Sequence, residues 1–153
     1  MTAERGTETR PWSEQHSIDD ASYREQLAYL HERSPFYRAK LTAAGFPSAL
    51  AAGGLADIGR LPLTEKHELK ATTTADNPVG AHLCAEPAEI VRIYSTSGTT
   101  GTPSYIPLTA GDLDNWTAGS ARSYAASGVA PGERIVSTYN AGPFVAGAAL
   151  AAF

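Results

Sequence analysis

The sequence has only one cysteine, Cys84, among its 153 residues. A single thiol cannot close an intrachain disulfide, which excludes a disulfide-stapled secreted scaffold. His82 lies two positions earlier, but that spacing on an extended segment does not define a catalytic pair. We therefore interpret Cys84 as a buried, unreactive thiol.

Long runs of one charge and long apolar runs are missing too. The formal net charge is -4 and the acidic and basic residues are mixed along the chain, so no electrostatic footprint for nucleic acid is present. No apolar stretch is long enough to span a bilayer, and residues 1–17 lack the apolar core of a signal peptide. These absences predict a cytoplasmic protein without a nucleic-acid or membrane partner.

Metal ligands at a useful spacing are also lacking. The histidines are scattered, and no pair has the spacing to cysteine or carboxylate that a zinc site requires. We predict no metal held by the side chains of this chain and interpret all four histidines as surface or loop residues. They are His16, His31, His67 and His82.

The composition of the whole chain is typical of a globular protein, with 42% hydrophobic and 18% charged residues. Residues 1–16 are predicted to form a disordered tail. A helix is expected to begin at Ser17, with Asp20 as its capping-box partner. Ser34 and Pro35 then provide the cap and first position of a second helix, which ends near Gly45.

Glycine and proline make residues 46–62 loop-rich, with Leu55 and Ile58 expected to pack a short helical turn against the core. Thr64 predicts the cap of another short helix over residues 65–70. The charged side chains of that helix are predicted to form a solvated face. They are Glu65, Lys66 and Glu68.

The second half of the chain alternates strands and helices. Alternating side chains predict a strand over residues 89–94, followed by a second strand over 104–108. A helix is expected to begin at the cap Thr109 and end at Gly128, with Asp112 as box partner and Trp116 and Tyr124 as core residues. A third strand over 134–139 and a helix from about 143 complete an α/β domain.

The chain ends inside an apolar pattern. Residues 148–153 have the composition of the middle of a buried helix, and no Gly, Asn or basic residue closes it. We therefore predict that the chain is truncated at its C-terminal end, and that isolated folding leaves strand edges exposed.

The loop after the first strand carries the strongest chemical signal. Residues 95–100 are all Ser, Thr or Gly. Gly98 and Gly101 let the backbone approach a ligand closely, exposed N–H groups can form an anion nest, and the hydroxyls add donors. The predicted phosphate-binding residues are Ser95, Thr96, Ser97, Gly98, Thr99, Thr100 and Gly101.

The loop has two other interpretations. A P-loop of the NTPase kind requires lysine after its second glycine and a following helix, and this loop has neither. A Ser/Thr-rich hairpin turn without a ligand stays open, although so many small polar residues are costly to order. Composition and spacing alone indicate an anion-binding loop.

The string from Tyr94 to Pro103 resembles the phosphate loop of adenylate-forming ligases, Ser-Gly-Thr-Thr-Gly-x-Pro. Other segments narrow the resemblance to the phenylacetate–CoA ligase family, over about residues 20–153 and in the family's order. They are Ser34-Pro35-Phe36-Tyr37-Arg38, Leu61-Pro62-Leu63-Thr64-Glu65-Lys66, Glu89-Ile90-Val91-Arg92-Ile93 and Gly128-Val129-Ala130-Pro131-Gly132-Glu133.

The resemblance implies the N-terminal part of an AMP-binding ligase domain, over residues 17–153. Such enzymes join a carboxylate to ATP to give an acyl-adenylate and pyrophosphate, and then transfer the acyl group to coenzyme A. ATP, Mg²⁺ and coenzyme A are thus the expected cofactors, and a small-molecule carboxylate is the expected substrate. The resemblance leaves a homodimer of the parent open.

Some positions depart from the family pattern. Thr102 and Ser104 stand where relatives carry lysine, so phosphate is held less tightly or an arginine from elsewhere replaces that cation. Tyr139, Ala141 and Phe144 match the segment that lines the acyl pocket, where Ala141 replaces an aromatic residue. The aromatic pair could equally be core packing.

The catalytic residues of the family are expected downstream of Phe153, so the 153-residue chain alone is predicted to be inactive. Two alternatives stay open. The chain could be a phosphate- or protein-binding fragment without catalysis, or its parent could transfer the adenylated acid to an amine or a carrier protein.

Overall fold

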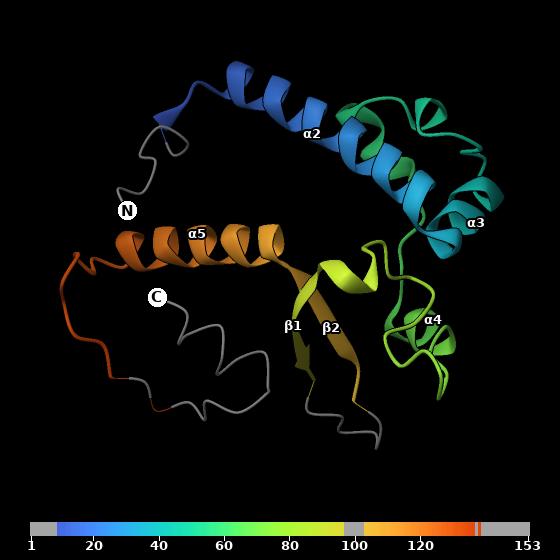
Figure 1. Cartoon of the computed structure of the whole chain (residues 1–153). Helices are drawn as coiled ribbons and strands as arrows, with labels where there is room; N and C mark the ends of the chain where they lie inside the picture. The colour runs from blue at the N-terminus through green and yellow to red at the C-terminus, as the bar shows by residue number, and fades with distance from the viewer. Residues whose placement is uncertain (1–8, 97–102, 137, 139–153) are drawn as a thin grey trace. The chain divides into compact units, whose positions relative to one another are not determined.

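The computed structural model describes residues 9–96, 103–136 and 138. The described residues fall into two compact units, which divide between Ala85 and Glu86. The N-terminal unit, residues 9–85, is built of helices. The C-terminal unit begins at residue 86 and contains a β-hairpin followed by a long helix (Figure 1).

Helix α2 spans Trp12–Arg33 and is the longest element of the N-terminal unit. It begins five residues before Ser17, so the predicted cap is wrong, and residues 12–16 of the tail predicted over residues 1–16 are helical instead. Pro11 occupies the N-cap with φ of -55°, a conformation that suits proline at a helix start. Ser17 therefore lies inside the helix, where its hydroxyl donates to the carbonyl of Ser13 at 3.1 Å.

Helix α3 spans Pro35–Ala43, as predicted. Ser34 is fully buried, and its hydroxyl oxygen accepts from the N–H of Tyr37 at 3.3 Å. Pro35 occupies the first turn, where its missing N–H costs nothing. Gly45 follows the helix with φ of +91°, a left-handed conformation that favours glycine.

Two 3₁₀ helices follow, η1 over Leu50–Ala52 and η2 over Leu55–Arg60. The carboxylate of Asp20 on α2 accepts from the N–H of Leu55 at 2.6 Å, so α2 caps the start of η2 across 35 residues. Asp20 therefore caps a distant helix, whereas the sequence predicted that it caps the start of its own helix.

A small apolar cluster holds the N-terminal unit together. Leu27 from α2 and Leu41 from α3 meet Phe46 and Ala52, and each of these residues is buried. Leu55 is half-buried, but Ile58 is 55% exposed, so the expected packing of Ile58 on the core is wrong. Leu61, just after η2, packs against the cluster instead.

Helix α4 spans Lys66–Ala71, with Glu65 rather than Thr64 as its N-cap. The sequence predicted Glu68 on a solvated face, but in the structure its carboxylate has two partners. One carboxylate oxygen accepts from the N–H of Glu65, and the other pairs with Lys40 on α3. These two bonds, in that order, lower the pKa of the Glu68 carboxyl.

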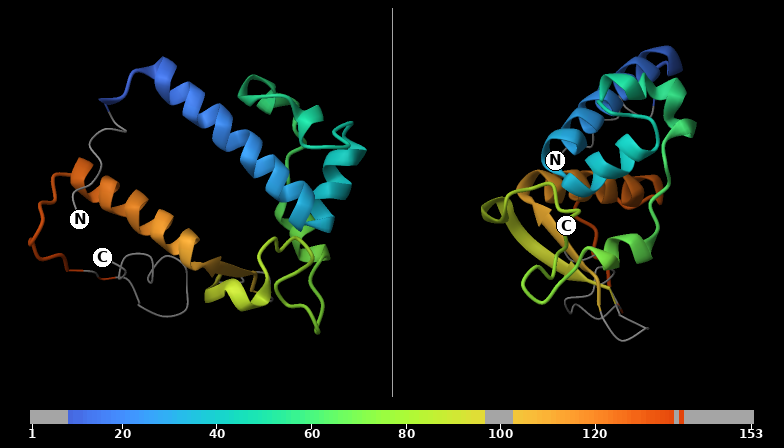
Figure 2. Two further views of the ribbon diagram at one scale, coloured as in Figure 1. Left: turned by 45° about the horizontal axis from the view of Figure 1, so that its top comes forward. Right: turned by 90° about the vertical axis from the view of Figure 1, so that its right-hand side faces the viewer.

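The C-terminal unit begins with the 3₁₀ helix η3, Pro87–Glu89, and strand β1, Ile90–Ser95. Strand β2, Tyr105–Thr109, pairs with β1 in the antiparallel sense and leads directly into helix α5, Ala110–Ala126 (Figure 2). Both strands lie one residue later than their predicted starts.

Helix α5 begins as the sequence predicts. The hydroxyl oxygen of Thr109 accepts from the N–H of Asp112 at 3.2 Å, and the carboxylate of Asp112 accepts from the N–H of Thr109 at 2.9 Å. This reciprocal capping box fixes the turn between β2 and α5. Gly128, with φ of +89°, follows the helix end.

One face of the hairpin is covered and the other is open. Tyr94 and Leu108 are buried, and the Tyr94 ring packs edge-on against Trp116 of α5 at 5.7 Å between centroids. Val91 and Ile93 point to the opposite face and are more than half exposed. The predicted alternation of side chains between the two faces of this strand is therefore confirmed, and the buried face is the one that carries Tyr94.

The predicted third strand is not found among the described residues. Residues 134–136 and 138 have no regular secondary structure, and Val136 is 88% exposed. A strand needs a neighbour to pair its backbone groups, and the described residues offer this segment none. The predicted last helix lies outside the described residues. Helices with a small antiparallel sheet agree with the mixed architecture expected from the sequence.

Candidate functional site

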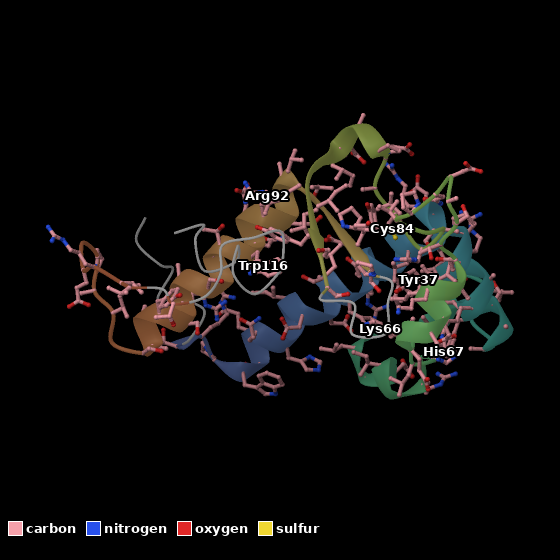
Figure 3. The ribbon with its side chains drawn as sticks, turned by 90° about the horizontal axis from the view of Figure 1, so that it is seen from below. Tyr37, Lys66, His67, Cys84, Arg92 and Trp116 are labelled. Atoms are coloured by element: carbon pink, nitrogen blue, oxygen red, sulfur yellow. The ribbon has the colours of Figure 1, made fainter. Side chains whose placement is uncertain are left out.

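The β1–β2 hairpin carries the predicted phosphate loop between its strands. Ser95 ends β1 and pairs with Tyr105, the first residue of β2. The hairpin itself rests on α5 through Tyr94 and Trp116, shown on its helix in Figure 3. Ser95 and Tyr105, which flank the loop in the sequence, therefore belong to a packed hairpin, and loops that carry function are commonly held on such rigid elements.

Beyond Ser95 the two ends of the hairpin are joined by one further pair of hydrogen bonds. The N–H of Thr96 donates to the carbonyl of Ser104 at 3.0 Å, and the N–H of Ser104 donates to the side-chain oxygen of Thr96 at 3.0 Å. The hydroxyl of Thr96 thus has a main-chain partner. The sequence indicated Ser104 only as a position without lysine. Its main-chain bonds to Thr96 were not predicted, because they depend on the strand register.

The structure describes two of the predicted phosphate-binding residues, Ser95 and Thr96, and both are half-buried. The others, Ser97, Gly98, Thr99, Thr100 and Gly101, lie outside the described residues. The same is true of the predicted acyl-pocket residues Tyr139, Ala141 and Phe144. Their roles stay predictions.

Ser104 has a second unusual feature. Its hydroxyl oxygen is buried and has no hydrogen-bond partner among the residues that the structure describes. The resemblance described above implies a lysine at this position in the wider superfamily, and this chain has serine. A short side chain at this position cannot supply the charge that lysine would bring to a phosphate.

Arg92 is the one basic residue in the two described strands, and its side chain already contacts Tyr94. Its guanidinium donates to the Tyr94 hydroxyl at 3.2 Å and lies 5.9 Å from the centre of that ring. Arg92 also lies three residues before Ser95, the last residue of β1. A replacement for the missing lysine is therefore not provided by the strands themselves.

The Cys84 region does not form a nucleophilic site. Cys84 is half-buried, and burial raises the pKa of its thiol, which keeps it protonated. His82 is also half-buried, so it is not simply a surface residue, and its ring lies 2.8 Å from the hydroxyl of Thr72. The thiol contacts the carbonyl of His82 rather than its ring.

Among the described residues, no group of three or more His, Cys, Asp or Glu side chains is placed to hold a metal ion. No helix in that part of the chain is both long enough and apolar enough to cross a membrane.

Comparison with known proteins identifies the relatives of this chain. It is 36% identical over 145 residues to the phenylacetate-coenzyme A ligase of Thermus thermophilus, which covers 94% of the chain and 31% of that enzyme. The corresponding enzyme of Escherichia coli is 33% identical over 141 residues, which covers 92% of the chain and 31% of that enzyme. The chain is related to the phenylacetate-coenzyme A ligases. No family model matches it.

The solved structures agree with this relationship. A 2-hydroxyisobutyryl-CoA ligase in complex with 2-HIB-AMP and CoA superposes with a TM-score of 0.76 and 29% identity, over 94% of the chain and 31% of that protein. A second structure of that ligase, in the postadenylation state with 2-HIB-AMP, gives a TM-score of 0.75 and 27% identity over 94% of the chain and 30% of that protein.

The resemblance to phenylacetate-coenzyme A ligases predicted from the loop and the flanking segments is therefore confirmed. The chain spans about a third of the length of these relatives. The architecture of the described residues is that of the matching part of a CoA ligase.

Proposed function

We propose that this chain supplies the phosphate-binding hairpin of an ATP-dependent, AMP-forming carboxylate–CoA ligase. One observation supports this most directly. A loop of Ser, Thr and Gly residues joins two antiparallel strands, in a chain whose structural neighbours hold an acyl-AMP and CoA. Such a loop can offer backbone and hydroxyl donors to the pyrophosphate that leaves during adenylation.

In this proposal the residues from Ser97 to Gly101 hold the β- and γ-phosphates of ATP. Mg²⁺ would accompany the phosphates, because it is commonly held by substrate phosphates together with few protein ligands. The hydroxyls of the loop would share its phosphate partners, and the ion would neutralise charge on the leaving pyrophosphate. Coenzyme A is the proposed acyl acceptor.

The carboxylate class is the finer part of the proposal. Tyr139 and Phe144 would line the acyl pocket, and Ala141 would leave it wider than a pocket with a third aromatic ring. We therefore propose aryl acids and related carboxylic acids, with reduced preference for aryl groups. The predicted homodimer and cytoplasmic location stay open within this proposal.

The test is pyrophosphate release by the protein that the complete reading frame encodes, supplied with ATP, Mg²⁺ and a panel of aryl and alkyl carboxylates. The Thr99→Ala/Thr100→Ala variant should lose about a hundredfold or more of the carboxylate-dependent rate, since each lost donor to developing charge costs on that order. A matched control is Thr73→Ala/Thr74→Ala, a pair of exposed threonines in the N-terminal unit, which should keep the rate.

The outcomes separate the alternatives. Release that is carboxylate-dependent and sensitive to the loop variant supports adenylation. Added coenzyme A should then give a thioester. Release followed by transfer only to an amine or a carrier protein would replace the CoA acceptor. A folded protein that binds ATP but releases no pyrophosphate with any acid would instead be a phosphate-binding module.

A further inference from the structure

The last rung of the hairpin is completed by a side chain. In a regular antiparallel pair, two opposite residues exchange hydrogen bonds between their N–H and carbonyl groups. Here the N–H of Thr96 follows that rule and donates to the carbonyl of Ser104 at 3.0 Å. The return bond, also 3.0 Å, runs from the N–H of Ser104 to the side-chain oxygen of Thr96. We call this pair of bonds the Thr96–Ser104 clamp.

From this geometry we propose that Thr96 is a positioning residue, which holds the two ends of the phosphate loop together instead of binding phosphate itself. The inference rests on the proposed function, because it assigns a role within the same loop. It differs from the sequence-based prediction, which grouped Thr96 with the hydroxyls that contact phosphate.

The position of the clamp explains how it would act. Ser95 and Tyr105 form the last regular pair of the ladder, and the clamp adds one further attachment beyond them. A loop whose ends are already fixed loses less conformational entropy when it orders around a ligand. A clamp at Thr96 and Ser104 should therefore favour phosphate binding without any direct contact.

The clamp depends on a specific side chain. The acceptor must be an oxygen one bond from Cβ, which serine and threonine share. Valine has the shape of threonine but no oxygen, so Thr96→Val removes the acceptor and keeps the branched side chain. Thr96→Ser keeps the acceptor and removes the methyl group. Ser104→Ala is the matched control, because both clamp bonds of Ser104 come from its main chain.

Two measurements on the protein encoded by the complete reading frame test the inference. Hydrogen exchange at the Ser104 amide, followed by NMR, measures whether the clamp bond is formed and needs no catalysis. Calorimetric titration with MgATP measures how tightly the loop binds its ligand. In Thr96→Val the Ser104 amide should lose its protection, and MgATP should bind about fivefold more weakly, as expected for one lost hydrogen bond. Thr96→Ser should restore both properties, and Ser104→Ala should keep the amide protected.

Several outcomes would overturn the inference. Weaker MgATP binding in Thr96→Val with an unchanged Ser104 amide would mean that the hydroxyl contacts phosphate directly. An unprotected Ser104 amide with unchanged MgATP binding would mean that the clamp does not position the loop. Equal damage in Thr96→Ser and Thr96→Val would assign the effect to the methyl group. Absence of pyrophosphate release in the wild type would contradict the proposed function, and the exchange experiment would still test the clamp.

Discussion

At the scale of single residues, a half-buried polar network links Thr72 at the end of α4 with His82 in the following loop. The hydroxyl of Thr72 donates to the carbonyl of Leu69 at 2.8 Å, so it can only accept from the ring nitrogen Nδ1 of His82, which lies 2.8 Å away. This arrangement requires the ring tautomer of His82 that has its proton on Nδ1. Gly80 makes room for this contact, because a Cβ there would lie 2.5 Å from the Thr72 hydroxyl.

Burial of His82 predicts a dependence of stability on pH. Burial lowers the pKa of the His82 ring from its ordinary value of 6.5, so the unfolded chain binds a proton more readily than the folded one. The contribution to the unfolding free energy is complete above the unfolded pKa and is lost as the pH falls below it. We expect the unfolding free energy, measured with urea, to fall between pH 7.5 and pH 5.5 (a window of about one unit on either side of that value).

The control for this prediction is His82→Asn, whose amide can donate to Thr72 but does not titrate in this window. The carboxyl groups of Asp20, Asp57 and Glu68 have lowered pKa values, so they stay ionised throughout the window. The variant should show a smaller fall in unfolding free energy than the wild type. The same fall in both proteins would assign it to other groups.

At the scale of elements, the contact between β1 and α5 decides whether the hairpin keeps its orientation. Tyr94 is 3% exposed, and its ring meets the half-buried Trp116 edge-on. Trp116→Ala should lower the unfolding free energy by about 2–3 kcal/mol, somewhat less than for a fully buried tryptophan. The chain has only one other tryptophan, Trp12, which is 71% exposed.

This pair of tryptophans supplies its own control. Trp12→Ala should change the unfolding free energy by less than about 0.5 kcal/mol, because it removes a mostly solvated side chain. Denaturant titrations of the two variants, with circular dichroism as the signal, compare them directly. Equal costs for both substitutions would show that the contact with Tyr94 does not stabilise the C-terminal unit.

The elements also show how far local sequence reasoning reaches. Helix α3 and the start of α5 were predicted correctly, because Ser34 and Thr109 cap them through bonds three residues away. The start of α2 was missed, because Ser17 is a good cap in isolation but the helix already extends past it. Asp20 and Glu68 were misassigned, since their partners Leu55 and Lys40 are distant in sequence.

In the candidate site too, local features could be predicted from the sequence and a contact between the strands could not. The sequence identified the loop and the family, because both depend on a contiguous string of residues that the relatives share. It did not predict the bond between the Thr96 hydroxyl and Ser104, because that bond depends on which residues of β1 and β2 stand opposite each other. Register is set by the packing of one sheet face, here by Tyr94 and Leu108.

At the scale of the whole molecule, the 153-residue chain exposes apolar surface that the described residues leave uncovered. The open face of the hairpin presents Val91 at 57% and Ile93 at 51% exposure. The described sheet has only two strands, so each strand also has an outer edge with unpaired backbone groups. Uncovered apolar strands with free edges commonly mark places where another chain segment packs.

We therefore expect the 153-residue chain, when produced by itself, to associate as its concentration rises. The open face of β1 should drive this association, so the Val91→Thr/Ile93→Thr variant, which keeps β-branched side chains, should sediment closer to the monomer at the same concentration. Leu63→Thr is the control, because Leu63 is 89% exposed but lies outside the strands. Sedimentation velocity over a range of concentrations compares the three proteins. If Leu63→Thr reduced association as much as the strand variant, general apolar exposure would be the cause, and the open face of the hairpin would have no special role.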